Sequence, residues 1–191
     1  MNRIIFGVAG LGVGAFHLQN LLKSKKVFVK TICDFDKKKL FFYQQKHKIR
    51  NITENVNDII NDKEINAIVI ATNDNFHCEQ ILGALKKNKH VFVEKPICLT
   101  SVELKKNINL KKKKPDLILS TNLILRKHPF FKKLLIDLKQ TKKNYYLEGE
   151  YNYGRLKKLT HGWRSKIKNY SITLGGGIHI LDLILQIKKN I

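Results

Sequence analysis

The chain has 191 residues, of which 43% are hydrophobic and only 3 are proline, and this composition excludes a largely disordered protein. Basic residues outnumber acidic residues by 37 to 15, which gives a formal net charge of +22 at pH 7. Apolar stretches such as residues 67–72 are much shorter than the roughly 20 residues that cross a bilayer, so no membrane-spanning helix is predicted.

Most of the basic residues are lysines, and they are spread along the whole chain. An excess of lysine, asparagine and isoleucine is typical of an AT-rich coding sequence. Specific nucleic-acid sites instead gather basic residues on one face, with arginines for base edges or aromatic rings for stacking. We therefore expect no specific nucleic-acid partner, only nonspecific attraction of polyanions at low salt.

The N-terminus and the cysteines indicate the cellular compartment. Residues 1–14 lack the long apolar core and the cleavage site of a signal peptide. Cys33, Cys78 and Cys98 form no CxxC pair, so we expect no structural metal and interpret each thiol as a small buried side chain in a reducing compartment. A cytoplasmic protein without a membrane partner is the expectation.

Strands and helices alternate from the first residues onward. Residues 3–9 form an apolar run rich in β-branched side chains, glycines interrupt it at 10–14, and an amphipathic helix follows over 15–23. A second apolar strand over 27–33 precedes a helix over 37–46. This order predicts a βαβ unit.

Two more strands are predicted over residues 67–71 and 90–94, separated by a helix around 76–87. A further strand over 117–121 completes a first domain, which we place at residues 1–122. Continuous apolar strands that alternate with helices predict an α/β fold with a parallel sheet covered on both faces.

Residues 123–191 are assigned to a second domain because the pattern changes there. A helix near 129–139 is followed by alternating apolar and polar side chains over 145–153, which is typical of a half-exposed antiparallel strand. Glycines at 175–177 then precede a last helix over 178–188.

The sharpest local motif is Gly10-x-Gly12-x-x-Ala15, which lies between the first strand and the first helix. In that position the first glycine of a dinucleotide fingerprint permits a tight turn and the second lets the backbone approach a pyrophosphate. The following helix N-terminus offers N–H groups and positive partial charge to the phosphates. Gly14 adds local freedom. The alternative, a merely tight connection, is disfavoured by the βαβ setting.

Asp34 ends the second predicted strand, where a carboxylate can accept hydrogen bonds from the ribose hydroxyls of adenosine. This favours NAD over NADP. Asp36 is an alternative for the same role, and Lys37 and Lys38 could instead bind the 2′-phosphate of NADP.

Glu94, Lys95 and Pro96 follow a strand at the predicted carboxyl edge of the sheet, which is where open α/β folds bind ligands. A lysine there can contact the nicotinamide ribose or a substrate hydroxyl. Its positive charge lowers the cost of deprotonating an alcohol during hydride removal.

His179 follows three glycines at the start of the last predicted helix, and Asp182 lies on a neighbouring part of the same helix face. A neutral histidine could take the proton of a hydroxyl group. An equally good interpretation is a structural histidine in a helix that packs through Leu181 and Leu185.

Together these motifs resemble the Gfo/Idh/MocA family of NAD(P)-dependent oxidoreductases, the group of glucose–fructose oxidoreductase and inositol dehydrogenase. The resemblance implies a Rossmann domain, a second α/β domain with an open sheet, and hydride transfer between NAD(P) and a hydroxyl or keto group of a sugar, cyclitol or nucleotide-sugar. It also allows for a homo-oligomer formed through the second domain. The motifs are GVAGLGVG (7–14), ICDFD (32–36), AIVIATNDNFH (67–77), KHVFVEKPICLT (89–100), LRKHP (125–129), HGWR (161–164) and LGGGIHILDL (174–183).

The resemblance assigns roles to individual residues. Lys95 and His179 match the catalytic lysine and histidine of the family. The cofactor-binding candidates are Gly10, Gly12, Val13, Gly14, Asp34, Thr72, Asn73, His77, Glu94, Lys95 and Pro96. The candidates for the border of the substrate pocket are Arg126, Trp163, Arg164, Tyr170 and Asp182, and arginine there suits a phosphate or carboxylate.

Two departures from the family pattern qualify these roles. Many members have an aspartate four residues before the catalytic histidine, where this chain has Gly175, and Asp182 is an alternative for orienting His179. Members also continue well past the histidine helix, so we expect a fragment, a truncated reading frame or a protein that completes its sheet with a partner. The alternative function is a catalytically silent or truncated dinucleotide-binding protein.

Overall fold

The computed structural model describes residues 3–140, 146–155, 157, 160–168 and 170–189. The chain divides into two compact units, Met1–Thr121 and Asn122–Ile191. Each unit is considered by itself below.

Unit 1 contains a parallel sheet of six strands in the order β3-β2-β1-β4-β5-β6. The chain starts in the middle of the sheet, adds β2 and β3 on one side, and then crosses back to add β4, β5 and β6 on the other. The order therefore reverses between β1 and β4, and such a switch point is where open α/β sheets bind ligands. The strands are β1 (Ile4–Ala9), β2 (Val27–Cys33), β3 (Asn51–Thr53), β4 (Ala67–Ile70), β5 (His90–Val93) and β6 (Leu119–Thr121).

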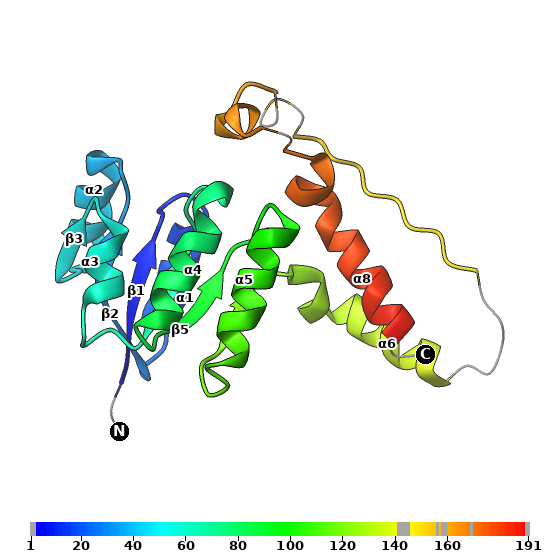
Figure 1. Ribbon diagram of the computed structural model, residues 1–191, viewed down its shortest axis with the longest axis horizontal. Helices are drawn as coiled ribbons and strands as arrows, with labels where there is room; N and C mark the ends of the chain where they lie inside the picture. The colour runs from blue at the N-terminus through cyan, green and yellow to red at the C-terminus, as the bar shows by residue number, and fades with distance from the viewer. Residues whose placement is uncertain (1–2, 141–145, 156, 158–159, 169, 190–191) are drawn as a thin grey trace. The chain divides into compact units, whose positions relative to one another are not determined.

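Helices cover both faces of this sheet (Figure 1). Helices α1 (Gly14–Leu22) and α2 (Lys37–His47) pack on one face. Helices α3 (Val56–Asn61), α4 (His77–Lys86) and α5 (Ser101–Lys112) pack on the other, where α4 contacts both α3 and α5.

The strands carry apolar side chains on both faces, which explains their continuous hydrophobic runs. In β4, Ile68 and Ile70 belong to the core under α3 and α4, whereas Val69 belongs to the core under α1 and α2. In β5, Val91 belongs to the core under α3 and α4, and Phe92 packs against the core under α1 and α2. The sheet is therefore buried between two separate apolar layers.

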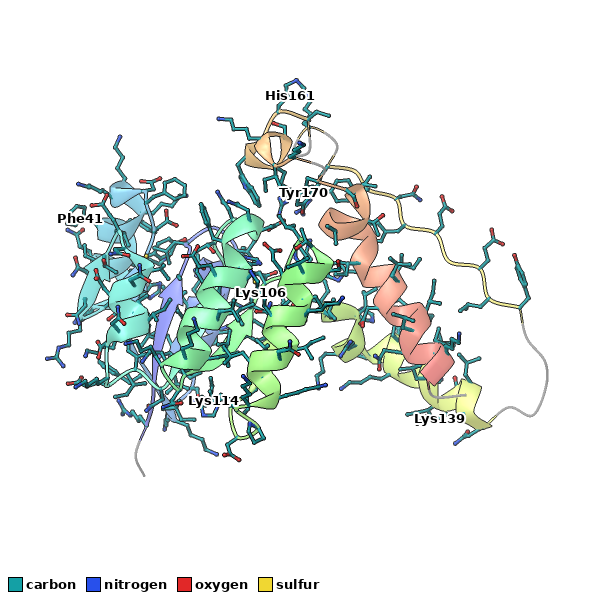
Figure 2. All side chains as sticks on the ribbon, viewed as in Figure 1. Phe41, Lys106, Lys114, Lys139, His161 and Tyr170 are labelled. Carbon is teal, nitrogen blue, oxygen red and sulfur yellow. The ribbon has the colours of Figure 1, made fainter. Side chains whose placement is uncertain are left out.

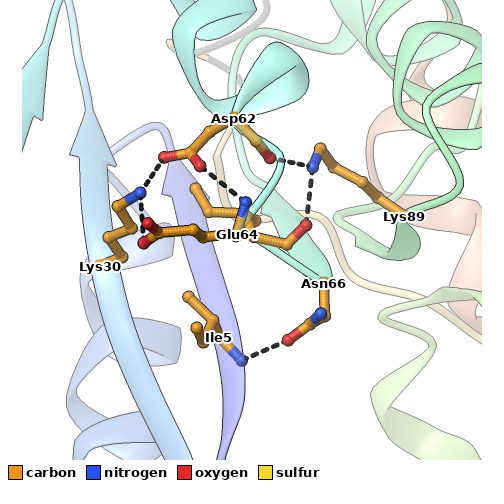
Figure 3. A network of polar contacts seen from close by, with 7 residues as sticks. Ile5, Lys30, Asp62, Glu64, Asn66 and Lys89 are labelled. Carbon is orange, nitrogen blue, oxygen red and sulfur yellow. Dashed lines mark hydrogen bonds and ion pairs between the residues drawn. The ribbon is translucent and has the colours of Figure 1, made fainter.

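A network of polar contacts joins the segment between α3 and β4 to its neighbours, near the amino ends of the strands (Figure 3). Nζ of Lys30 lies 2.6 Å from Oδ2 of Asp62 and 2.8 Å from Oε2 of Glu64, and these hydrogen bonds raise the pKa of Lys30. Nζ of Lys89 is buried and donates to the carbonyl oxygens of Asp62 (2.6 Å) and Ile65 (2.7 Å). Burial lowers the pKa of Lys89. These contacts hold the segment between α3 and β4 against β2 and against the residue that precedes β5.

Unit 2 contains α6 (Pro129–Gln140) and α8 (Ile178–Lys189), which contact each other and the 3₁₀ turn Ile124–Lys127. A second 3₁₀ turn spans Trp163–Lys166, and a π-helical turn over Thr173–Gly177 leads directly into α8.

The predicted strand over residues 145–153 is wrong where it can be compared with the structure. Residue 145 lies outside the described residues, and residues 146–153 have an irregular backbone. The segment runs beside α8, since a Cβ on Gly149 would lie 2.8 Å from Cδ1 of Ile180. Alternation of apolar and polar side chains fits a helix-packed segment as well as a strand, and a strand also needs a neighbouring backbone to pair with.

The strands and helices predicted for residues 3–46 and 67–121 are confirmed with small changes at their ends, as are the helices near 129–139 and 178–188. The sequence analysis gave no residue range for α5 (Ser101–Lys112), and it missed β3 and α3. Both are short: β3 has three residues and α3 has six, of which only Ile59 and Ile60 are buried. Elements of this length contain too few turns or alternations for periodicity to detect them.

Within the described part of the chain, no helix is long and apolar enough to span a membrane. The lysines lie mainly at exposed positions. Lys106 in α5 is exposed, whereas Lys114, after the end of the same helix, is half-buried and donates to Asn88 (Figure 2). This agrees with the interpretation of the positive charge as a solvated surface.

Candidate cofactor-binding and active site

The glycine loop, residues 10–14, joins β1 to α1 at the carboxyl edge of the sheet of unit 1. Gly10 has a φ of +88°, and a Cβ at this position would overlap the carbonyl group of Ala71 at the end of β4. Its N–H donates to the carbonyl oxygen of Cys33 over 2.7 Å. The fold itself therefore requires glycine at position 10.

Gly12 is different, because the fold does not require it. A Cβ placed on Gly12 would have no described protein atom within 4 Å. Gly12 and Val13 are exposed at the start of α1, and Val13 supplies no side-chain cap in the described structure. The open backbone and the N–H groups of the first helical turn suit a phosphate group. The loop thus has the open backbone that the predicted contact with a dinucleotide pyrophosphate would need.

Asp34 lies directly after β2 and is buried, with 6% of its surface exposed. Its Oδ2 accepts a hydrogen bond of 2.6 Å from the backbone N–H of Leu11, and its Oδ1 accepts one of 2.9 Å from the N–H of Asp36. A carboxylate has about four acceptor positions, so room remains for ribose hydroxyls. Asp34 therefore holds the glycine loop and can also receive a ligand.

Asp36, the alternative ribose ligand, has a structural role in this protein. Its Oδ1 accepts from the backbone N–H groups of Lys38 (3.0 Å) and Lys39 (3.3 Å) and caps α2. Nζ of Lys37 lies 3.1 Å from Oε1 of Glu54. These contacts favour Asp34 over Asp36 as the partner of the ribose.

The loop after β4 is the second wall of the site. Ala71 packs beside Gly10 and Gly14, so this loop adjoins the glycine loop. Oγ1 of Thr72 donates to Oε1 of Gln80 in α4 over 2.7 Å. Asn73 is half-buried and precedes a 3₁₀ turn over Asp74–Phe76.

His77 is expected from the sequence to bind the cofactor. Its side chain is fully buried, however, so the ring is not placed to touch a ligand directly. Its Nδ1 lies 2.7 Å from the carbonyl oxygen of Pro96, and its Nε2 lies 3.2 Å from that of Thr72. The ring therefore connects two loops that line the site.

The third wall is the EKP loop, which consists of Glu94, Lys95 and Pro96 after β5. Glu94 is buried, and its Oε2 accepts from the backbone N–H of Lys95 over 3.3 Å. Its Oε1 lies 2.7 Å from Nε2 of His17 in α1. Lys95 itself is half-buried.

His17 is a residue that the sequence analysis missed. Its ring also packs edge-on against Phe92 of β5, with 5.1 Å between the ring centroids. A possible signal was a histidine one turn after Gly14, on the helix side that faces the sheet. Nothing local in the sequence indicates that its partner is Glu94.

In unit 2 the structure brings Arg126 and Asp182 together. Nε of Arg126 donates to Oδ2 of Asp182 over 2.7 Å, and the second guanidinium contact reaches Oδ1. Asp182 is buried at 8% exposure, and its hydrogen bonds raise the pKa of Arg126. Arg126, which is expected to border the substrate pocket, is thus paired with Asp182, which is the alternative for orienting His179.

The three remaining substrate candidates form a second group in unit 2. The guanidinium of Arg164 lies 4.3 Å from the ring centre of Trp163, and its Nε donates to the hydroxyl of Tyr170 over 3.0 Å. Stacking and hydrogen bonding hold this arginine in one orientation.

His179 lies in the first turn of α8 and is buried, directly after the π-helical turn. A Cβ on Gly176 would overlap the ring of Tyr153, so the glycines let the aromatic segment approach the turn. Single π turns are frequent at functional sites. Lys95 and His179 belong to different units.

The cysteines have the properties of structural residues. All three are free and buried, and burial raises the pKa of Cys33 to about 12 and that of Cys98 to about 11. Among the described residues, no group of histidine, cysteine and acidic side chains could hold a metal ion.

With this geometry established, comparison with known proteins decides the family. Residues 4–122 match the family described as an oxidoreductase family with an NAD-binding Rossmann fold. The chain belongs to the Gfo/Idh/MocA family of oxidoreductases. The family resemblance of the motifs, the α/β fold and the Rossmann sheet are thereby confirmed.

Proteins of this family that act on inositol are among the relatives. The chain is 31% identical over 129 residues to myo-inositol 2-dehydrogenase of Thermotoga maritima, an alignment that covers 67% of this chain and 38% of the relative. The fold is similar to that of myo-inositol 2-dehydrogenase from Lactobacillus plantarum, with a TM-score of 0.87 and 23% identity over 97% of this chain and 56% of the other. Scyllo-inositol dehydrogenase from Lactobacillus casei, solved with NAD(H) and scyllo-inositol, gives a TM-score of 0.81 at 21% identity, with 97% and 56% covered.

The chain spans about two fifths of the length of the curated relatives that it matches first. The family and its NAD-binding fold are therefore shown for this chain, and the activity of a whole protein is a matter for proposal.

Proposed function

We propose that this chain provides the cofactor-binding part of an NAD-dependent dehydrogenase that oxidises a hydroxyl group of a cyclitol or a related sugar. One observation carries the proposal. The exposed backbone at Gly12, the buried carboxylate of Asp34 and the half-buried Lys95 lie on three loops at the same edge of one parallel sheet.

The two halves of the dinucleotide would lie on opposite sides of the switch point between β1 and β4. The pyrophosphate would contact the glycine loop, and the adenosine ribose would contact Asp34. The nicotinamide half would lie toward Thr72, Asn73 and Lys95. Asp34 favours NAD, because its negative charge opposes the 2′-phosphate of NADP.

The bound cofactor supplies the hydride acceptor, and the chain supplies the proton chemistry. The ammonium group of Lys95 stabilises the developing alkoxide of the substrate. The family resemblance gives His179, in unit 2, the role of receiving the hydroxyl proton. The residues of unit 2 would form part of a substrate-binding or oligomerisation domain.

A calorimetric titration of the purified chain with NADH tests the proposal. Wild-type chain should bind saturably, and Gly12→Val should not bind, because its side chain would occupy the path of the pyrophosphate. Lys95→Ala should lose turnover of myo-inositol or scyllo-inositol and weaken NADH binding by about tenfold at most. Absence of NADH binding by a folded wild-type chain would contradict the proposal.

A catalytically silent dinucleotide-binding protein is the second candidate. It is favoured by Gly175, which is buried in the π-helical turn at the position where many family members have an aspartate. Saturable NADH binding without turnover of any cyclitol or sugar would support it. In either case the three buried free thiols fit a reducing, cytoplasmic compartment.

A further inference from the structure

The EKP loop is held at both ends by histidine side chains. His77 contacts the carbonyl oxygen of Pro96 at one end (2.7 Å), and His17 contacts the carboxylate of Glu94 at the other (2.7 Å). Lys95 lies between these two anchors. His77 also contacts Thr72, so one anchor leads to the loop after β4.

The contact with His17 connects the EKP loop to α1, the helix that follows the glycine loop expected to bind the pyrophosphate. His17 is in α1, the helix whose first turn begins at Gly14 of the glycine loop. Its ring is held on a second side by Phe92, the β5 residue two positions before Glu94. The imidazole is therefore fixed against β5 and does not depend on Glu94 alone for its orientation.

Glu94 contacts both His17 and the backbone of Lys95, so it couples the position of the imidazole to that of the lysine. The carboxylate is buried, so removal of its imidazole partner leaves a charged group short of a hydrogen bond in a poorly solvated place. Its other oxygen accepts from the N–H of Lys95, so a shift of the carboxylate moves the backbone that carries the lysine.

We propose that His17 is a positioning residue that sets the place of Lys95 through Glu94, and thereby aligns the nicotinamide side of the site with the pyrophosphate side. The inference rests on the proposed function, because it assumes that Lys95 meets the nicotinamide half of the cofactor. His17 itself touches neither the cofactor nor the substrate in this role.

Two ligands separate positioning from general stability. ADP-ribose reaches the glycine loop and Asp34 but lacks nicotinamide, whereas NADH extends to the EKP loop. His17→Leu should weaken NADH binding about tenfold, the loss expected when a displaced Lys95 no longer meets the nicotinamide half of the cofactor. It should leave ADP-ribose affinity within about twofold of wild type. Gln19→Leu in the same helix controls for an added apolar side chain.

His17→Gln provides the rescue, because its side-chain N–H can reach the carboxylate and should restore most of the NADH affinity. His17→Asn, which is too short to do so, should behave like His17→Leu and serves as the second variant if the leucine variant does not fold. Equal weakening of both ligands, or no change in either, would overturn the proposal.

Hydrogen exchange provides a readout without any ligand. In the free chain, the Lys95 amide should exchange faster in His17→Leu or His17→Asn than in wild type, while amides of β2 stay protected. Unchanged exchange at Lys95 would contradict positioning by His17. Failure of wild-type chain to bind either ligand would instead contradict the proposed function, so the two failures are distinguishable.

Discussion

The carboxylate of Asp34 accepts a hydrogen bond of 2.6 Å from the backbone N–H of Leu11, so the acid at the end of β2 holds the glycine loop that follows β1. The residue expected to bind the ribose thus also holds the loop that is expected to bind the pyrophosphate. A change at Asp34 should therefore affect both stability and affinity.

Asp34→Ala should lower NADH affinity by about 10-fold to 100-fold, because a buried charge-assisted hydrogen bond and the ribose acceptor are lost together. Asp34→Asn keeps a carbonyl acceptor for Leu11 and should unfold at a higher temperature than Asp34→Ala. It should also raise the ratio of NADPH to NADH affinity, because the negative charge is gone. Calorimetry and thermal unfolding measure these effects. Equal loss of stability in both variants would contradict the role of the Leu11 contact.

Gly10 and Gly12 should differ sharply when substituted. Gly10→Ala should destabilise unit 1 by about 1–3 kcal/mol or more, because its φ of +88° and its contact with Ala71 exclude a Cβ. Gly12→Ala has open space around the new Cβ and should leave the free energy of unfolding nearly unchanged while weakening NADH binding. Denaturant unfolding with parallel binding measurements tests the pair. A destabilising effect confined to Gly12→Ala would show that the glycine roles are reversed.

Arg126→Ala should destabilise unit 2, because it leaves the buried carboxylate of Asp182 without its guanidinium partner. The expected cost is about 1–3 kcal/mol, since the arginine is itself partly exposed. Arg126→Ala combined with Asp182→Asn should be less destabilising than the sum of the single changes. Hydrogen-exchange protection of α8 reports the effect. Additive losses would mean that the pair contributes no coupling.

The stability of the chain should fall as the pH rises above 9. Burial raises the pKa of Cys33 from 9.0 to about 12 in the folded chain. Between these values the unfolded thiol releases its proton and the folded thiol keeps it, so rising pH favours the unfolded state. The slope from this group is at most about 1.4 kcal/mol per pH unit. Urea unfolding at pH 8 and pH 10, under reducing conditions, should show a smaller decrease for Cys33→Ala than for wild type. The same decrease in both would exclude Cys33 as the source.

Much of unit 1 could be predicted from the sequence because its signals are local. Continuous apolar runs specify the buried strands, and Gly10-x-Gly12 specifies a turn that only certain backbone angles allow. Three residues of β3 and six of α3 were too short to give a periodic signal. Residues 146–153 show the opposite error, because alternation gave a strand signal without a pairing partner in the described structure.

In the candidate site, too, some residues could be predicted from local sequence patterns and others could not. The sequence by itself predicted the glycine loop, Asp34 and the EKP loop as candidates for the cofactor site, since each follows a strand whose carboxyl end meets the same edge of a parallel sheet. Only the tertiary structure decided that His17 pairs with Glu94, that His77 is an internal link, and that Arg126 engages Asp182. These contacts join residues far apart along the chain, and their partners are selected by how helices pack on the sheet and on one another, which no local pattern encodes.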